Sequence, residues 1–199
     1  MAKINTRTTF EKILTDGAKK GMLPRMSNDS IKWFRDQAKK TKISDSGLIR
    51  ENTDRLKNRA AIGEMVFFFY DPKHKATLPY YDSFPLIFKI EEYNDSFLGI
   101  NLHYLPIPLR AKLMDALYDL TTNKKLNEKT RLEISYGILK SAAKYKYFKP
   151  CIKKYLKAHV RSRFLKVHSY EWDVAMTLPV ESFVKKTKTK VWEESRGKI

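Results

Sequence analysis

The sequence predicts an α+β fold, in which a small antiparallel β-sheet or an SH3-like half-barrel is flanked by N-terminal and C-terminal helices. Two observations support this prediction. Three runs rich in aromatic and β-branched residues follow one another between residues 65 and 105, separated by residues that favour turns. On both sides of this segment, apolar residues recur at the spacing of amphipathic helices.

The charge of the chain is unevenly distributed, and this suggests how the chain is organised. Residues 1–61 carry 15 Lys and Arg against 7 Asp and Glu, residues 62–130 carry 8 against 9, and residues 131–199 carry 17 against 6. A neutral middle with basic ends indicates a packed scaffold that presents cations to a polyanion. We therefore predict a basic helical N-terminal arm over residues 1–61, followed by an α+β core domain with basic C-terminal helices and a tail over residues 62–199.

Composition excludes several classes of protein. The chain has 199 residues, of which 42% are hydrophobic, and only 7 Gly and 8 Pro, so it is expected to fold. A single cysteine, Cys151, cannot form an internal disulfide or a cysteine-based zinc site. The sequence has no apolar run as long as a bilayer span and no secretion signal. We expect a soluble cytoplasmic protein with no membrane partner.

The first 60 residues predict two weakly amphipathic helices, separated near Pro24. Residues 28–30, which are Asn, Asp and Ser, are expected to cap the second helix. Because so few apolar residues occur per turn, these helices should lie on the core or on a partner chain. The two apolar stripes consist of Phe10, Ile13 and Leu14, and of Ile31, Phe34 and Ala38.

The middle of the chain predicts three short antiparallel strands. They cover residues 65–70, 85–93 and 97–105, and Pro or Asn-Asp-Ser turns separate them. Because a sheet of two or three strands needs cover, the helical pattern that starts at Pro108 is expected to pack on it.

The C-terminal third predicts helices rich in lysine. Residues 127–148 and 151–164 each have an apolar stripe at helical spacing, and Pro150 suits the start of the second helix. A strand is expected over residues 164–167, followed by a short helix around Trp172. The last residues form a basic tail that Trp192 is expected to anchor.

The strongest local signal is a basic run from Lys140 to Lys166, which has 10 basic residues and no acidic one. Each cation that neutralises a phosphate releases condensed counterions, so such a run can bind double-stranded DNA without reading its sequence. Interleaved aromatic residues, such as Tyr145 and Tyr155, either stack on unpaired bases or pack in the core, which is their commoner role. The candidate nucleic-acid-binding residues are Lys140, Lys144, Lys146, Lys149, Lys153, Lys154, Lys157, Arg161, Arg163, Lys166, Lys185, Lys186, Lys188 and Lys190.

A second candidate site is the aromatic tract "LPYYDSFPL" between the first two predicted strands. Tyr80, Tyr81 and Phe84 could form an exposed edge that binds a protein partner, because aromatic residues are enriched at interfaces. The alternative is that they belong to the core.

The sequence offers little support for an enzyme. The four histidines lack zinc-ligand spacing, no glycine-rich phosphate loop is present, and His103 is expected to be a hydrogen-bonded structural residue. The nearest approach to a metal-dependent nuclease combines the segment 71–73 with Glu91, Glu92 or Asp95, but its proline suits a turn better than a catalytic strand. We predict no catalytic residue, no metal site and no cofactor.

Several blocks resemble a known family in sequence and in order. They are "DPKHKATLPYYDSFPL", "FLGINLHYLPIPLRAKLMDALYD", "ISYGILKSAAKYKYFKPCIKKYL" and "KVWEESR", within residues 62–196. This region resembles the DNA end protector proteins, minor virion proteins of T-even-type contractile-tailed phages and their marine relatives. The resemblance implies a virion protein, present in the host cytoplasm during assembly, that binds the terminus of the packaged genome and shields it from host exonuclease. It transfers no catalytic residue.

Two hypotheses follow. In the first, the protein is a non-enzymatic DNA-end binder whose basic helices hold the phosphates. In the alternative, it is a structural assembly subunit that docks on acidic virion proteins of the portal, neck or baseplate. Salt distinguishes them, because DNA affinity falls linearly with salt on logarithmic axes.

Overall fold

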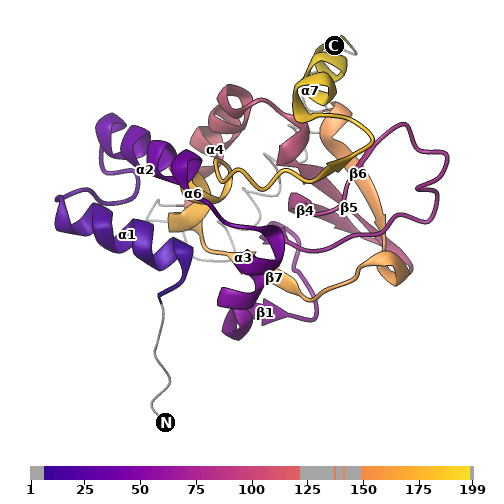
Figure 1. Ribbon diagram of the computed structural model, residues 1–199, viewed down its shortest axis with the longest axis horizontal. Helices are drawn as coiled ribbons and strands as arrows, with labels where there is room; N and C mark the ends of the chain where they lie inside the picture. Colours follow the sequence, from indigo (N-terminus) through magenta and orange to yellow (C-terminus); the bar gives the residue numbers. More distant parts are fainter. Residues whose placement is uncertain (1–6, 122–136, 138–140, 142–148, 198–199) are drawn as a thin grey trace.

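A computed structural model describes residues 7–121, 137, 141 and 149–197. Its centre is an open, six-stranded antiparallel sheet with the strand order β1-β7-β2-β4-β5-β6 (Figure 1). The strands are β1 (Leu56–Lys57), β2 (Met65–Phe67), β4 (Leu86–Glu92), β5 (Ser96–Asn101), β6 (Ile152–Leu156) and β7 (Phe164–Val167). A second sheet pairs β3 (Tyr81–Asp82) with β8 (Phe183–Val184). The predicted α+β class is confirmed, and the sheet is an open one.

The three strands predicted for the middle of the chain are β2, β4 and β5. Met65 pairs with Phe88 across β2 and β4, and Phe88 pairs with Ile100 of β5. At Gly99 of β5 a Cβ atom would lie 2.6 Å from Cδ1 of Ile87, so a larger residue there would displace the Ile87 side chain. Each strand is shorter than the run that predicted it, because tight pairing ends where the chain turns.

The two remaining large strands come from the C-terminal third. β7 was predicted, and it pairs with both β1 and β2. The helix predicted over residues 151–164 is wrong: the chain forms β6, then a 3₁₀ turn, then a loop into β7. Pairing with β5 along the edge of the sheet, where Tyr155 stacks on Phe97, overrides a helical spacing that is only local.

Six helices surround the sheet within the described residues. Ser27 caps α2 in place of the predicted residues 28–30, and Ser44 caps a third N-terminal helix that the sequence did not predict. The helices are α1 (Thr9–Lys19), α2 (Asn28–Lys40), α3 (Asp45–Glu51), α4 (Ile107–Thr121), α6 (Trp172–Ala175) and α7 (Lys188–Gly197). Short 3₁₀ turns are η1 (Thr53–Arg55), η2 (Leu102–Tyr104), η3 (Lys149–Cys151), η4 (Lys157–His159) and η5 (Ser169–Glu171).

Each face of the sheet carries its own hydrophobic cluster. Phe67 and Phe88 join the larger cluster, which also contains Phe10 and Phe34 of the N-terminal helices. Phe68 belongs to a smaller, largely aromatic cluster on the other face. The N-terminal helices therefore lie on the core, which is one of the placements that their narrow apolar stripes predicted.

Ion pairs strengthen this attachment. Asp173 of α6 accepts hydrogen bonds from Arg25 at 3.0 Å and from Arg35 at 2.6 and 2.9 Å. The division at residue 61 stays a prediction. The helix predicted over residues 127–148, with Lys140, Lys144 and Lys146, lies outside the described residues.

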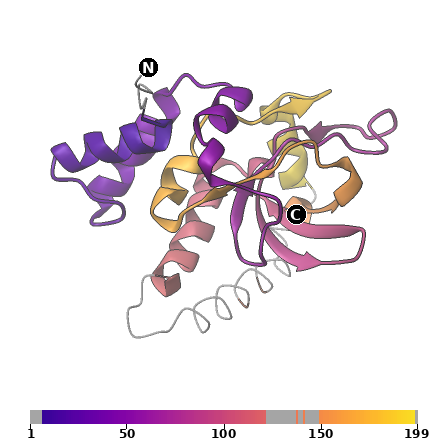
Figure 2. The same cartoon turned by 90° about the horizontal axis from the view of Figure 1, so that it is seen from below.

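The helices α1 and α2 and the strand β6 lie at opposite ends of the molecule (Figures 1 and 2). α7 lies at the β6 end, beside η2. Among the helices described, none combines the length and apolar character that crossing a membrane would require.

Candidate nucleic-acid interface

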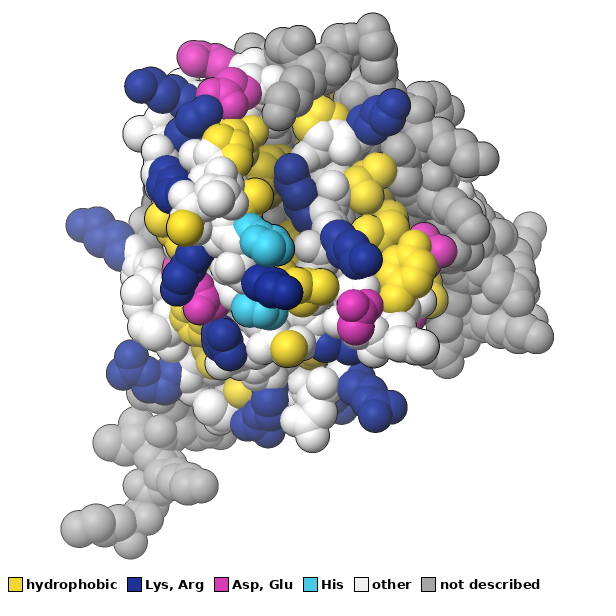
Figure 3. All heavy atoms as spheres, turned by 90° about the vertical axis from the view of Figure 1, so that its right-hand side faces the viewer, with side chains coloured by type: hydrophobic (Ala, Val, Ile, Leu, Met, Phe, Trp, Pro, Cys, Tyr) yellow, Lys and Arg dark blue, Asp and Glu magenta, His cyan; other side chains and the backbone are white. Residues whose placement is uncertain are grey.

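The described part of the basic run lies around the edge strand of the large sheet. Lys149 precedes β6, Lys153 and Lys154 lie on it, and Arg161 and Arg163 are exposed in the loop that leads to β7. The side of the molecule shown in Figure 3 presents many Lys and Arg side chains and few acidic ones, with apolar side chains between them.

A hollow of about 830 Å³, called here the basic groove, lies beside this loop. Five of its side chains are cationic and one, Glu92, is acidic, while Phe97 and Phe164 add aromatic surface. It is lined by Asn58, Arg59, Ala60, Lys89, Glu92, Asn94, Phe97, Lys157, Val160, Arg161, Ser162, Arg163 and Phe164.

The single acid of the basic groove is paired with two of its cations. Glu92 forms ion pairs with Lys89 and Lys157. Burial alone would raise the pKa of the Glu92 carboxyl, but its hydrogen bonds to Lys157 and Lys89 outweigh burial and lower the pKa. Glu92 therefore stays ionised at neutral pH and neutralises one charge. The exposed arginines Arg59 and Arg163 leave the groove strongly positive.

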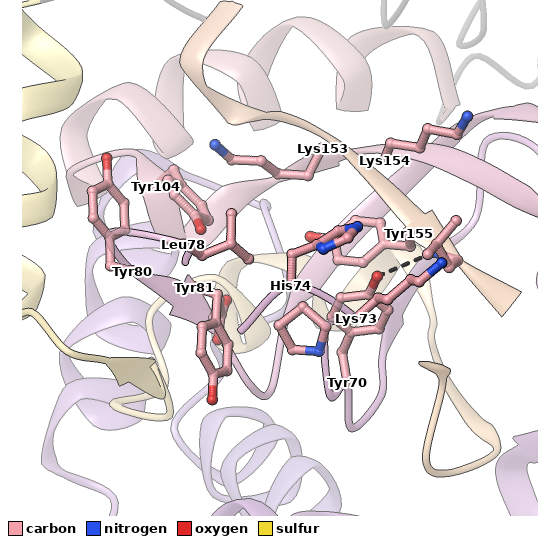
Figure 4. Close-up of a pocket in the computed structure, with 13 residues that line it drawn as sticks. Tyr70, Lys73, His74, Leu78, Tyr80, Tyr81, Tyr104, Lys153, Lys154 and Tyr155 are labelled. Atoms are coloured by element: carbon pink, nitrogen blue, oxygen red, sulfur yellow. Dashed lines mark hydrogen bonds between the residues drawn. The ribbon is translucent and has the colours of Figure 1, made fainter. Parts of the chain in front are cut away.

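A second hollow of about 410 Å³, called here the tyrosine pocket, lies between β6 and the segment at residues 72–81 (Figure 4). Figure 4 shows Lys153 and Lys154 along one side, with Lys73 and His74 entering from the opposite side. The Lys153 ammonium lies 4.1 Å from the centre of the Tyr104 ring. The pocket is lined by Tyr70, Pro72, Lys73, His74, Leu78, Tyr80, Tyr81, Asp82, Tyr104, Lys153, Lys154, Tyr155 and Leu156.

A buried polar network holds the floor of the tyrosine pocket. Asp82 contacts His103 Nδ1 at 2.8 Å and accepts from Asn101 Nδ2 at 3.0 Å. Asn101 also donates to the Tyr155 hydroxyl at 3.1 Å. His103 is thus the hydrogen-bonded structural residue that the sequence suggested. Burial raises the pKa of Tyr104 and Tyr155, so both hydroxyls stay protonated at physiological pH.

Two of the predicted tail lysines, Lys185 and Lys186, lie beside the tyrosine pocket. The Lys185 ammonium donates to the carbonyl oxygens of Lys75, Ala76 and Leu78 at 2.7, 2.8 and 2.8 Å, so it fastens the loop that forms one wall of the tyrosine pocket. The Lys186 ammonium lies 4.8 Å from the centre of the Tyr80 ring and pairs with Glu194. Both lysines therefore adjoin the pocket.

The other predicted lysines are more dispersed. Lys188 contacts Glu181 at 3.5 Å, and Lys190 is exposed on α7. Lys166 pairs with Glu64 at 2.5 Å on a central part of the sheet, away from the groove lining. The expected anchor Trp192 donates its indole N–H to the carbonyl oxygen of His103 at 2.8 Å and so fixes α7 to the core.

Comparison with known families decides what kind of protein carries this surface. A model of the family described as Phage T4 terminal DNA protecting protein matches residues 5–195. The chain belongs to this family. No curated protein and no solved structure matches the chain.

In this terminal DNA protecting family member, the predicted partner-binding residues separate. Phe84 is fully buried and stacks on Phe67, so it belongs to the core. Tyr80 is 9% exposed and Tyr81 is half-buried, and both line the tyrosine pocket. Partner binding at the two tyrosines stays a prediction.

Sequence reasoning missed four side chains of the two hollows, the cations Arg59, Lys73 and Lys89 and the imidazole of His74. Averaging charge over residues 62–130 concealed the local "KHK" at 73–75, which was the available signal. Lys89 is buried in β4, and the sequence gave no signal for it, because only the fold brings its ammonium group beside Glu92.

Of the carboxylates considered for a nuclease, Asp71 and Glu92 are engaged in ion pairs. Asp71 contacts Lys75 at 2.9 Å and Arg161 at 3.7 Å, and its hydrogen bond to Lys75 lowers the pKa of the carboxyl. Within the ranges that the structure describes, no three His, Cys, Asp or Glu side chains are grouped so as to hold a metal ion.

Proposed function

We propose that this protein covers the termini of phage DNA by binding them, and that the basic groove holds the phosphates near the end. Membership of the terminal DNA protecting family over residues 5–195 is the observation that carries the proposal. The groove supplies the physical means, because its three arginines, Arg59, Arg161 and Arg163, are exposed.

The expected binding is electrostatic and independent of DNA sequence. Arg59, Arg161 and Arg163 are exposed and extend from two loops, so they can approach successive phosphates without entering the grooves of the duplex. Arginine suits this role because its guanidinium donates to two phosphate oxygens at once. Such contacts position the protein on DNA but do not select a sequence.

Protection by this protein is proposed to be steric rather than enzymatic. A bound protein that occupies the terminal base pairs denies an exonuclease access to the scissile phosphates. We propose that it acts as a component of the virion, after synthesis in the host cytoplasm during phage assembly.

An exonuclease assay tests the proposal. The protein is mixed with end-labelled linear duplex, and the rate of label release by a double-strand exonuclease is measured. We expect the wild-type protein to slow release and a triple variant, Arg59→Glu, Arg161→Glu and Arg163→Glu, to lose that effect. The matched control places the same change in charge at the far end of the molecule, as Lys12→Glu, Lys32→Glu and Lys40→Glu on exposed positions of α1 and α2.

Two results would contradict the proposal. If the groove variant protects DNA as well as the wild type does, the groove is not the binding surface. If the wild-type protein has no affinity for linear duplex at physiological salt but co-purifies with portal, neck or baseplate proteins, the polyanion is an acidic virion protein. The assembly hypothesis would then replace DNA-end binding.

A further inference from the structure

We propose that the tyrosine pocket receives the unpaired terminal nucleotide of a DNA strand, with its base against the tyrosine rings and its phosphate among the surrounding cations. This inference rests on the proposed function and adds the feature that would distinguish an end from internal duplex.

The pocket is connected to the basic groove by shared residues. A third hollow of about 350 Å³ is lined by Phe69, Tyr70, Asp71, Tyr81, Ser83 and Arg161. Arg161 also lines the basic groove, while Tyr70 and Tyr81 also line the tyrosine pocket. The third hollow therefore shares lining residues with both the basic groove and the tyrosine pocket, and the proposed path of a strand from the groove to the pocket passes Arg161.

The lining of the pocket matches the chemistry of a nucleotide. Five tyrosines line it, of which Tyr81 is half-buried and the other four are 9% exposed or less. Lys73, His74, Lys153 and Lys154 supply donors around them. The one acid, Asp82, is 3% exposed, so it presents little charge to a ligand. Its Oδ2 contacts His103 and Asn101, and its Oδ1 accepts from the backbone N–H of Phe84. The volume of about 410 Å³ lies within the usual range for small-ligand sites, roughly 300–1,000 Å³.

Stacking explains why such a pocket would select ends. A base inside a duplex has both faces covered by its neighbours and both strands paired, so reaching it requires unstacking and unpairing. A terminal unpaired nucleotide requires neither. Stacking on aromatic side chains is tolerant of base identity, as a protein that binds genome termini of any sequence needs.

The walls of the pocket are held in place before any ligand arrives. Lys185 fastens the loop at residues 75–78 through three carbonyl oxygens. On the other side, the Tyr70 hydroxyl accepts from the backbone N–H of Leu156 at 3.1 Å, which fixes Tyr70 against β6 (Figure 4). Binding therefore needs little ordering of the protein, which favours affinity.

Affinities for three DNA probes of equal length test the inference. One duplex has single-nucleotide 3′ overhangs, one has single-nucleotide 5′ overhangs, and one is closed at both ends by hairpins. We expect the wild-type protein to prefer one or both open probes. We expect Tyr81→Leu and Leu78→Trp, which remove a ring and fill the pocket respectively, to reduce that preference about fivefold to 100-fold while leaving the affinity for the closed probe unchanged. Tyr170→Leu, at a tyrosine 49% exposed outside the pocket, is the control.

Photocrosslinking with 5-iododeoxyuridine locates the nucleotide independently of any substitution. Placed at the overhanging position, the probe should crosslink to peptides containing Tyr80 or Tyr81, and placed at an internal position it should not. Unchanged end preference in both pocket variants, or crosslinks that fall elsewhere, would overturn the inference while leaving the groove proposal standing. If the wild-type protein binds none of the probes, the proposed function fails and the pocket assignment with it.

Discussion

At the scale of single residues, Lys185 contributes more through the hydrogen bonds that it donates within the protein than through the charge that it presents to solvent. Lys185 has a positive φ of 72° and directs its ammonium group to three carbonyl oxygens of one loop. Three acceptors match the three N–H donors of an ammonium group. A residue chosen from the sequence as a phosphate ligand is thus a clamp for the wall of the tyrosine pocket.

Replacing Lys185 should loosen that loop without unfolding the protein. In Lys185→Met, we expect the amides of Thr77 and Leu78, which donate to the His74 carbonyl at 3.1 and 3.0 Å, to exchange with deuterium faster than in the wild type. The global free energy of unfolding should change by less than about 1 kcal/mol because the site is exposed. Lys190→Met is the control, and equal exchange in the two variants would contradict the clamp.

A buried ion pair gives a second prediction at this scale. Arg110 is fully buried and contacts Glu181 at 2.8 Å, and it also donates to the carbonyl oxygens of Leu105 and Met176, both at 2.7 Å. Burial alone would raise the pKa of the Glu181 carboxyl, but the charges of His103, Arg110 and Lys188 outweigh it and lower the pKa. Glu181 therefore favours the folded state when it is ionised.

Glu181→Gln should lower the free energy of unfolding by about 3 kcal/mol at pH 7, because it leaves the Arg110 charge uncompensated. A carboxyl whose pKa is lowered by folding contributes stability above its unfolded pKa of about 4.3 and loses it as the pH falls through the folded value. The difference between wild type and variant should therefore shrink below about pH 4 in urea titrations. Glu193→Gln, at an exposed position of α7, should be nearly neutral. A difference that does not vary with pH would refute this account.

At the scale of elements, the spacing of apolar residues predicted the strands whose structure depends on the local sequence. It failed for a strand that forms only by pairing with a distant strand. The strands β2, β4 and β5 were predicted because their aromatic and β-branched residues follow one another along the chain. β6 was not predicted, because the spacing of apolar residues around Tyr155 also fits a helix. Pairing with β5, where Tyr155 stacks on Phe97, makes this segment a strand. The basic groove could not be predicted, since Arg59, Lys89 and Arg163 meet only after the chain folds.

The attachment of the N-terminal helices can be tested through Asp173. Asp173→Asn removes the charge that Arg25 and Arg35 share, so we expect a loss of about 3 kcal/mol in the free energy of unfolding. Because these helices share the main hydrophobic cluster with the sheet, unfolding followed by Trp33 and by Trp172 fluorescence should occur in one transition. Separate transitions for α2 and the sheet would show that the two parts fold independently. Asp36→Asn, on the exposed face of α2, is the control.

At the scale of the whole molecule, both candidate hollows lie at the same end, although exposed lysines also occur on α1 and α2. The helices α1 and α2 lie at one end, and the basic groove and tyrosine pocket lie at the β6 end with the lysines of the tail nearby. The neutral middle of the sequence also contributes side chains to this end of the molecule, because its loop at residues 73–75 forms part of the tyrosine pocket.

The salt dependence of binding to linear duplex tests the central claim most directly. For the wild-type protein, log affinity should fall linearly with log salt, and the triple variant Arg59→Glu, Arg161→Glu and Arg163→Glu should lower the magnitude of the slope by about 2.7 if each arginine neutralises one phosphate. The control variant on α1 and α2 should keep the wild-type slope. An unchanged slope in the groove variant, or an equal reduction in the control, would contradict the assignment of DNA binding to this face.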